Sequence, residues 1–270
     1  IAVKECHIAH PALIERPRQA IMDLGLFTSV DARLEQRADG SVLHFVVKEK
    51  YYILPVPKLN RDDDNNISLG AEITIDNLAG LNQQLKLRYE TEDADGLSGG
   101  QTEANALRYI YPRLFGSQFA FHTEISQYRE PAEALDPAGT AVLSLYELEA
   151  WTASVQVLRW LAPRGPSRGW QVGAGLVWRR NGYDYGSGQP AAEFQDARAV
   201  GINVLGQFLD VHDYLFSRRG TEFGYAGEVG APALGSDTRY TRHEIFYRRY
   251  LLLDGRPHEN LEFQGRLGLS

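Results

Sequence analysis

Alternation of apolar and polar residues is the dominant pattern from about Asn66 to the end of the chain. In one segment after another every second residue is apolar, and charged residues or glycines occupy the positions between them; Ile67–Ile75 and Trp170–Trp178 are clear examples. A period of two residues predicts β-strands, because successive side chains of a strand point to opposite faces. The pattern predicts about ten strands.

The same alternation fits two architectures. A soluble sandwich places its apolar face in a core, whereas a membrane barrel turns it to lipid. The predicted strands run about 10–14 residues, against about 5–6 in most globular proteins. Short connections such as Gly116-Ser117 alternate with long ones such as Glu130–Thr140 and Gly182–Asp196, which is typical of outer-membrane barrels. We therefore expect an antiparallel transmembrane β-barrel. Its predicted lipid-facing residues include Trp170, Val172, Leu176, Trp178, Phe119 and Phe121.

The first 54 residues have a different pattern. Pro11–Leu24 carries apolar residues at helical spacing, and Gly25 is placed to end a helix. Two strands, Ser29–Glu35 and Val42–Val47, follow with a turn between them. The sequence predicts a small α+β module here. Its predicted core consists of Leu24, Leu26, Phe27, Val30, Leu43 and Phe45.

Composition narrows the functional classes. Hydrophobic residues make up 43% of the chain, but no run of about 18 apolar residues exists, as a transmembrane helix would need. The net charge of −7 disfavours nucleic acid as a partner. One cysteine allows no internal disulfide. The 14 tyrosines and 4 tryptophans suit a membrane–water interface, where one end of the ring is dry and the other wet.

Candidate chemistry is sparse. Gly96–Gly100 matches the G-x-S-x-G pattern of a nucleophile elbow, but a loop precedes and follows it where a strand and a helix are needed. Asp62–Asn66 offers hard oxygen ligands for calcium without the spacing of an EF-hand. An acid–His–Ser set on one strand face is formed by Glu124, His122 and Ser126. We expect each of these to be a solvated loop or a polar face, and we expect no catalytic, metal-binding or cofactor-binding residues.

Two stretches resemble a known family. Arg18–Asp31 resembles the second helix and following strand of a POTRA (polypeptide-transport-associated) domain, and Val46–Lys50 resembles its last strand. Asp76–Asn82 resembles a periplasmic turn of the barrel that follows such domains in the BamA/TamA family. Asp210–Gly220 resembles a family segment in which one strand turns into the next. The POTRA motif consists of Asp23, Leu24, Gly25, Leu26, Phe27 and Val30, and the barrel motif of Asp210, Asp213, Phe216, Arg219 and Gly220.

The resemblance implies a division into a POTRA-like module over residues 1–54, a linker over 55–65 and an outer-membrane barrel over 66–270. The chain departs from the family pattern in two ways. The first strand and helix of the POTRA domain are short or missing, and the barrel shows about ten strands where the family has 16. We expect further strands after Ser270, beginning with a loop that carries the family's Arg-Gly-aromatic motif, because a barrel in lipid must close.

The resemblance also implies a function. Proteins of this family insert or export polypeptides across the outer membrane of Gram-negative bacteria, with the N-terminal module in the periplasm. Exposed strand edges would pair with an extended client by β-augmentation. We expect such edges on the first barrel strand near Ile67–Ile75 and in the module at Val42, Leu43, Phe45 and Val46. The expected partners are the lipid bilayer and an unfolded polypeptide client or fused passenger. Alternatives are a secretion barrel or passive pore for a passenger domain absent from this chain, and an outer-membrane lipolytic enzyme.

Overall fold

A computed structural model describes most of the chain. The described residues are 11–24, 26–37, 40–49, 53–61, 67–93, 100–162, 168–213, 218–253 and 256–270. Gly25 and Phe216 of the two predicted motifs lie outside them, as do residues 62–66 and most of the Gly96–Gly100 loop.

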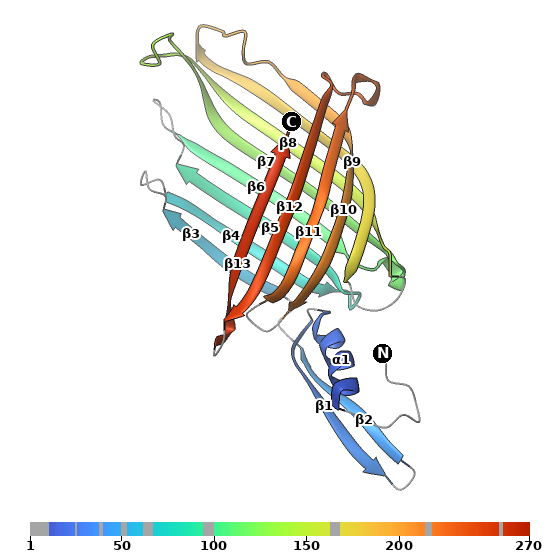
Figure 1. Cartoon of the computed structure of the whole chain (residues 1–270). Coiled ribbons are helices and arrows are strands. Elements are labelled where there is room, and N and C mark those ends of the chain that lie inside the picture. Colours follow the sequence, from blue (N-terminus) through green and yellow to red (C-terminus); the bar gives the residue numbers. More distant parts are fainter. Residues whose placement is uncertain are drawn as a thin grey trace.

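Within the described residues the protein is built almost entirely of β-strands, with one α-helix (Figure 1). The elements are α1 (Pro11–Met22), β1 (Phe27–Arg37), β2 (Gly40–Glu49), β3 (Ile53–Arg61), β4 (Ile67–Leu78), β5 (Gln83–Asp93), β6 (Gln101–Tyr111), η1 (Leu114–Gly116), β7 (Phe119–Leu135), β8 (Val142–Trp160), β9 (Gly169–Gly188), β10 (Ala197–Asp213), β11 (Arg218–Gly230), η2 (Pro232–Leu234), β12 (Tyr240–Leu253) and β13 (Arg256–Leu269). The prediction of a mainly β chain is confirmed.

The N-terminal module consists of α1 and the antiparallel hairpin β1–β2. In this hairpin Val30 pairs with Val47. The helix packs on β1, and Val30 and Met22 are buried, with 2% and 8% of their surface exposed. The predicted helix is slightly too long, because α1 ends at Met22. Leu24 is 40% exposed and does not belong to the core, because the chain has already left the helix before reaching it.

This core leads to a first prediction. Val30→Ala should destabilise the module by about 1–2 kcal/mol, because it removes two buried methyl groups. Leu24→Ala is the matched control and should cost less than about 0.5 kcal/mol, because the side chain is largely exposed. Amide hydrogen exchange of β1 measures both. Equal loss of protection in the two variants would contradict this assignment of the core.

The other eleven strands form one antiparallel sheet in the order β13-β12-β11-β10-β9-β8-β7-β6-β5-β4-β3. The ten strands predicted from the alternation correspond to β4–β13. The alternation did not predict β3, which occupies much of the segment 55–65 that was predicted to be a linker. Pro55 and Pro57 interrupt that segment, and proline inside a run argues against a central strand. The structure resolves the conflict, since β3 is an edge strand of the described sheet: its partner there is β4, from Ile53↔Ile75 to Arg61↔Ile67.

The connections beyond β7 and β9 also differ from the prediction. Two long loops were expected at Glu130–Thr140 and Gly182–Asp196. Instead, β7 continues to Leu135 and β9 to Gly188, and both stay paired with β8 along this length; Glu130, for example, pairs with Leu148. Strand pairing continues past the level at which the other hairpins turn. The three strands therefore form an extension of the sheet.

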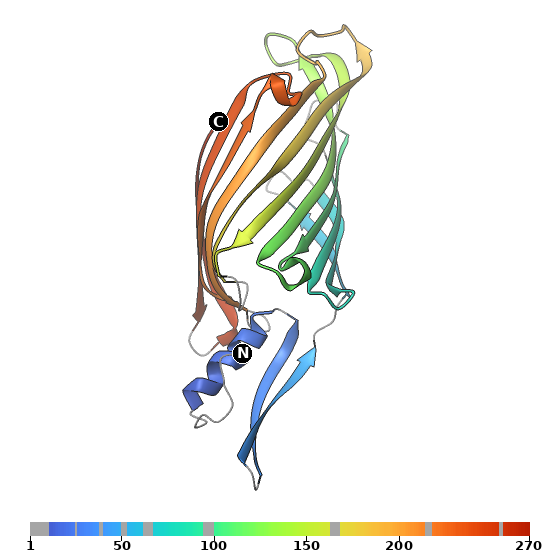
Figure 2. The same ribbon diagram turned by 90° about the vertical axis from the view of Figure 1, so that its right-hand side faces the viewer.

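The sheet curls into a trough. Strands β3 to β6 form one wall and β10 to β13 form the other, as two views at right angles show (Figures 1 and 2). In the described part of the chain its two edges, β3 and β13, are not paired with each other, so the sheet is open there. The N-terminal module lies beyond one end of the trough, which we call the module end. The extension of β7, β8 and β9 projects from the opposite, far end.

Candidate functional site

The outer face of the curved sheet is apolar. Along β9, Trp170 and Leu176 are 47% and 55% exposed, whereas Gln171 between them is 2% exposed on the inner face. Strand pairing extends the same face to β7, because Phe119 lies in register with Arg159 of β8, and Arg159 with Val172 of β9. All six residues predicted to face lipid lie on this outer face.

The inner face is polar and charged. Lys86 of β5 donates to Glu72 of β4 across 2.9 Å, and Arg108 of β6 pairs with Glu124 of β7 at 2.7 Å. On the opposite wall the largely buried carboxylate of Glu228 is held by Arg179 and by the hydroxyl of Tyr240. Gln207 donates to Gln171 at 2.7 Å. Buried polar groups are stabilised where they are hydrogen-bonded, as these four pairs are.

The polarity of the two faces reverses at one level of β7, β8 and β9. Gln127, Trp151 and Arg180 lie in register across these strands and mark the level. In the extension beyond it, Arg129 and Glu149 face outward and form an ion pair at 2.7 Å. On the inner face of the extension, Ala134 and Tyr146 are buried, and so is the polar side chain of Ser144. The strands are thus apolar outside toward the module end and polar outside beyond this level.

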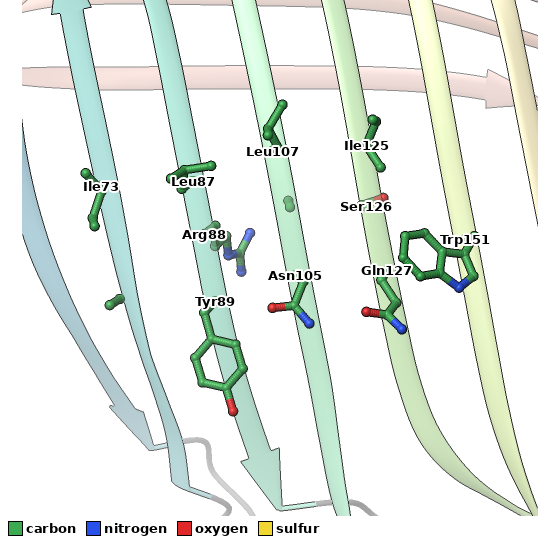
Figure 3. A pocket seen from close by; sticks show the side chains of 12 residues that line it. Ile73, Leu87, Arg88, Tyr89, Asn105, Leu107, Ile125, Ser126, Gln127 and Trp151 are labelled. Carbon is green, nitrogen blue, oxygen red and sulfur yellow. The ribbon is translucent and has the colours of Figure 1, made fainter.

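A shallow groove crosses the outer face at the same level (Figure 3). Two of its cross-strand neighbours, Asn105 and Gln127, carry amides, and Gln127 donates to Glu149 across 2.6 Å. The row directly toward the module end is aliphatic. That row consists of Ile73, Leu87, Leu107 and Ile125. Tyr89 and Trp151 flank the two amides, so aromatic and amide groups separate the charged level from the aliphatic one.

Among the described residues, a buried carboxylate of the module contacts the sheet. Asp23 follows the last turn of α1, and its side chain is 2% exposed. Its Oδ2 accepts a hydrogen bond from Arg168 Nη1 at 3.2 Å, and its Oδ1 lies 3.2 Å from His212 Nδ1. Arg168 precedes β9 and also binds Asp210 near the end of β10. Asp23 and Asp210, which belong to two separate predicted motifs, therefore share one arginine.

The remaining motif residues lie near this contact. Gly220 pairs with Val211 and Tyr250, and its φ of +139° lies in a region that L side chains rarely adopt. Arg219 pairs with His212, and Asp213 pairs with Arg218, so the described part of the barrel motif is the base of the β10–β11 hairpin. Arg168 and His212 were missed by the sequence analysis. The local sequence around each of them carries no signal for this contact, because their partner Asp23 is distant in the chain.

The candidate client-pairing residues lie on β2. Val42, Leu43, Phe45 and Val46 belong to a strand whose one partner among the described residues is β1, so its other edge is unpaired there. The second expected edge, Ile67–Ile75, is wrong. It lies in β4, which is paired with β3 on one side and β5 on the other, so its backbone groups are already bonded within the sheet.

The candidate catalytic set lies on the inner face of β7. Glu124 is ion-paired with Arg108 and hydrogen-bonded to its Nε at 2.8 Å. His122 and Ser126 share its face through alternation along the strand. In the described part of the chain, no group of three or more acidic, histidine or cysteine residues is arranged to hold a metal ion. No helix among the same residues is long and apolar enough to span a membrane.

The sheet is curved and antiparallel, with an apolar outer face and a polar inner face, and the outer face becomes polar beyond one level. This organisation is typical of a transmembrane β-barrel wall. No protein-family model matches the chain, and no curated protein matches it by sequence.

Two solved structures share the fold. BamA from Haemophilus ducreyi, in a form lacking POTRA domains 1–3, aligns with a TM-score of 0.54 and 14% identity over 98% of this chain and 50% of that chain. CdiB from Acinetobacter baumannii aligns with a TM-score of 0.59 and 13% identity over 92% of this chain and 46% of that chain. The chain spans about half the length of each. At these identities the likeness concerns the fold.

Proposed function

We propose that this chain is the membrane-embedded part of a Gram-negative outer-membrane protein of the BamA/TamA type, which inserts or exports polypeptides. The bilayer surrounds the outer face of the sheet, and the N-terminal module, a POTRA-like domain, lies in the periplasm. The chain binds its clients through backbone pairing and catalyses no covalent reaction.

The observation that carries this proposal is the reversal of polarity along β7, β8 and β9. In a soluble sandwich the same face of a strand remains apolar along its length, because it faces one core. Here the outer face carries Trp170 and Leu176 on the module side of the reversal level, and Arg129 and Glu149 beyond that level. A strand that leaves hydrocarbon and enters water accounts for the change.

Unpaired strand edges support a role in handling polypeptides. An exposed edge offers a row of unbonded N–H and C=O groups to an extended chain, and this is the physical basis of β-augmentation. Among the residues that the structure describes, β2 and β3 have such edges. Val46 of β2 is 43% exposed and Leu59 of β3 is 76% exposed, so side chains at both edges are accessible to a client.

Photo-crosslinking tests the proposal. A benzophenone amino acid replaces Val46 or Leu59, and the protein in lipid vesicles is mixed with a urea-unfolded eight-stranded outer-membrane protein that is diluted out of urea. We expect crosslinks to the unfolded protein from both positions and none after it has folded. Val204 is the matched control, because it is 43% exposed but lies in β10, which is paired on both sides.

Equal crosslinking from Val204 would contradict selective pairing at the edges. The fate of the client distinguishes the two transport roles. A client that becomes protease-resistant within the bilayer indicates insertion, whereas one recovered inside or outside the vesicle indicates export. The likeness to CdiB as well as to BamA makes both outcomes compatible with the fold.

A further inference from the structure

The module is tied to the sheet at two places that lie far apart. The chain itself joins β2 to β3, which is one edge of the sheet. Asp23, at the other side of the module, binds the base of β9 and β10. Strands β4 to β8 separate the two places, and the curl of the sheet puts them on opposite walls. In Figure 2, α1 lies below the wall that contains β10, whereas the chain enters β3 at the other wall.

The chemistry at Asp23 is that of a specific contact. Its carboxylate, 2% exposed, accepts a hydrogen bond from Gln19 Nε2 of α1 at 2.8 Å and one from Arg168 at 3.2 Å. Arg168 is 28% exposed and His212 26%, so both partners are also partly withdrawn from water. A buried carboxylate without its cationic partner is strongly unfavourable. The attachment therefore depends on these particular side chains.

We propose that Asp23, Arg168, His212 and Asp210 form an anchor that fixes the module across the module end of the sheet. Asp23 and Arg168 are its central pair, and His212 and Asp210 orient them. With the anchor intact, the free edge of β2 has a defined position relative to the two walls. Without it, the covalent connection from β2 to β3 still holds the module to the sheet, and the module can change its orientation.

The two carboxylates of the helical segment provide a matched comparison. Glu15 lies in α1, and Asp23 lies just after the helix. Unlike Asp23, Glu15 is bonded within the helix: its Oε2 accepts a hydrogen bond from Nε of Arg18 at 2.8 Å. This hydrogen bond lowers the pKa of Glu15, so the group is charged at neutral pH. Glu15→Gln therefore makes the same change from carboxyl to amide as Asp23→Asn while leaving the contact to the sheet intact. For Arg168→Gln the control is Arg180→Gln, which breaks an exposed pair with Asp196 in the far-end half of β9.

Spin-label distances on the full chain in detergent test the anchor. Labels at Gln36→Cys in β1 and Leu81→Cys in the turn after β4, in a Cys6→Ser background, report the orientation of the module. We expect one narrow distance distribution for the parent protein and for both controls. Asp23→Asn and Arg168→Gln should each broaden it, with the released population rising about 100-fold. The double variant should be no broader than either single variant, because both changes break the same contact.

A narrow distribution in Asp23→Asn, or an equally broad one in Glu15→Gln, would overturn the anchor. Retention of the folded sheet is checked in each variant by its resistance to SDS without heating, so that loss of the fold is not mistaken for release of the module. The measurement contains no client. The anchor can therefore fail while the crosslinking experiment succeeds, and the reverse outcome is equally recognisable.

Discussion

Leu176→Lys should impair folding into lipid vesicles by about 2 kcal/mol. Leu176 is 55% exposed on the outer face of β9. It is the next outward-facing residue after Ala174, which is in the middle of the apolar run between Trp170 and Trp178. A lysine on the lipid face of a barrel costs about 2–4 kcal/mol at the midplane and less toward the interfaces. The expected value is thus at the lower end of that range. Urea titration of the vesicle-folded protein, followed by its heat-dependent mobility in SDS, measures it.

The control must lie at the same level on the inner face. Val177, the next residue, is unsuitable, because it is 3% exposed inside the sheet and a lysine there would be buried. Ser154 of β8 is better: it faces inward, in register with Glu124. Ser154→Lys should cost less than about 0.5 kcal/mol, because the new ammonium lies on a polar wall beside a carboxylate. Similar losses at both positions would show that the assignment of the two faces is wrong.

Gly220→Ala should destabilise the sheet by about 3 kcal/mol. A Cβ atom at this position would lie 1.9 Å from the carbonyl oxygen of Asp210 and 2.8 Å from Cα of Val211. Both are backbone atoms of the paired strand, so the two strands would have to separate. The φ of +139° adds backbone strain, since a side chain disfavours that conformation. Strain and overpacking each cost about 1–3 kcal/mol.

Gly206→Ala is the control for this substitution. Gly206 lies in β10, and the nearest atom to a Cβ there is Cγ1 of Val172 at 4.0 Å, an ordinary van der Waals contact. We expect a change within about 0.5 kcal/mol. The same urea titration compares the two alanine variants. A Gly220→Ala protein as stable as Gly206→Ala would mean that the base of β10–β11 can open at little cost, and would remove the structural reason for glycine at this motif position.

Alternation predicted the strands well because it is a local property. Each residue of β9 faces outward or inward according to its position in the strand alone, and the ten segments found from sequence correspond to β4–β13. The pattern failed where a local signal had two meanings. Residues 55–65 were predicted to be a linker, yet Pro55 and Pro57 occupy an edge strand in which one side needs no ladder hydrogen bonds. The polar segments 130–135 and 182–188 were predicted to be loops. They belong instead to strands that continue beyond the level at which the outer face is apolar.

The contact between module and sheet could not be predicted in the same way. Asp23 and Asp210 were singled out through their resemblance to family motifs, but the arginine that joins them was not. Arg168 lies 145 positions from Asp23 in the chain, and no periodicity relates the two. Pairing over such a separation is decided by the curl of the sheet, which brings the base of β9 to the module. The functional roles of the β2 residues remain predictions that crosslinking will test.

The two prolines of β3 have a consequence for any strand that pairs with its open edge. In antiparallel pairing, every second residue directs its N–H and C=O toward the same neighbour. Pro55 and Pro57 are two residues apart and have no N–H, so they fit the positions whose backbone groups point away from β4. An incoming strand would find acceptors but no donors at these two places. It would be bound by an incomplete ladder and would separate from β3 more easily than from an edge with all its donors.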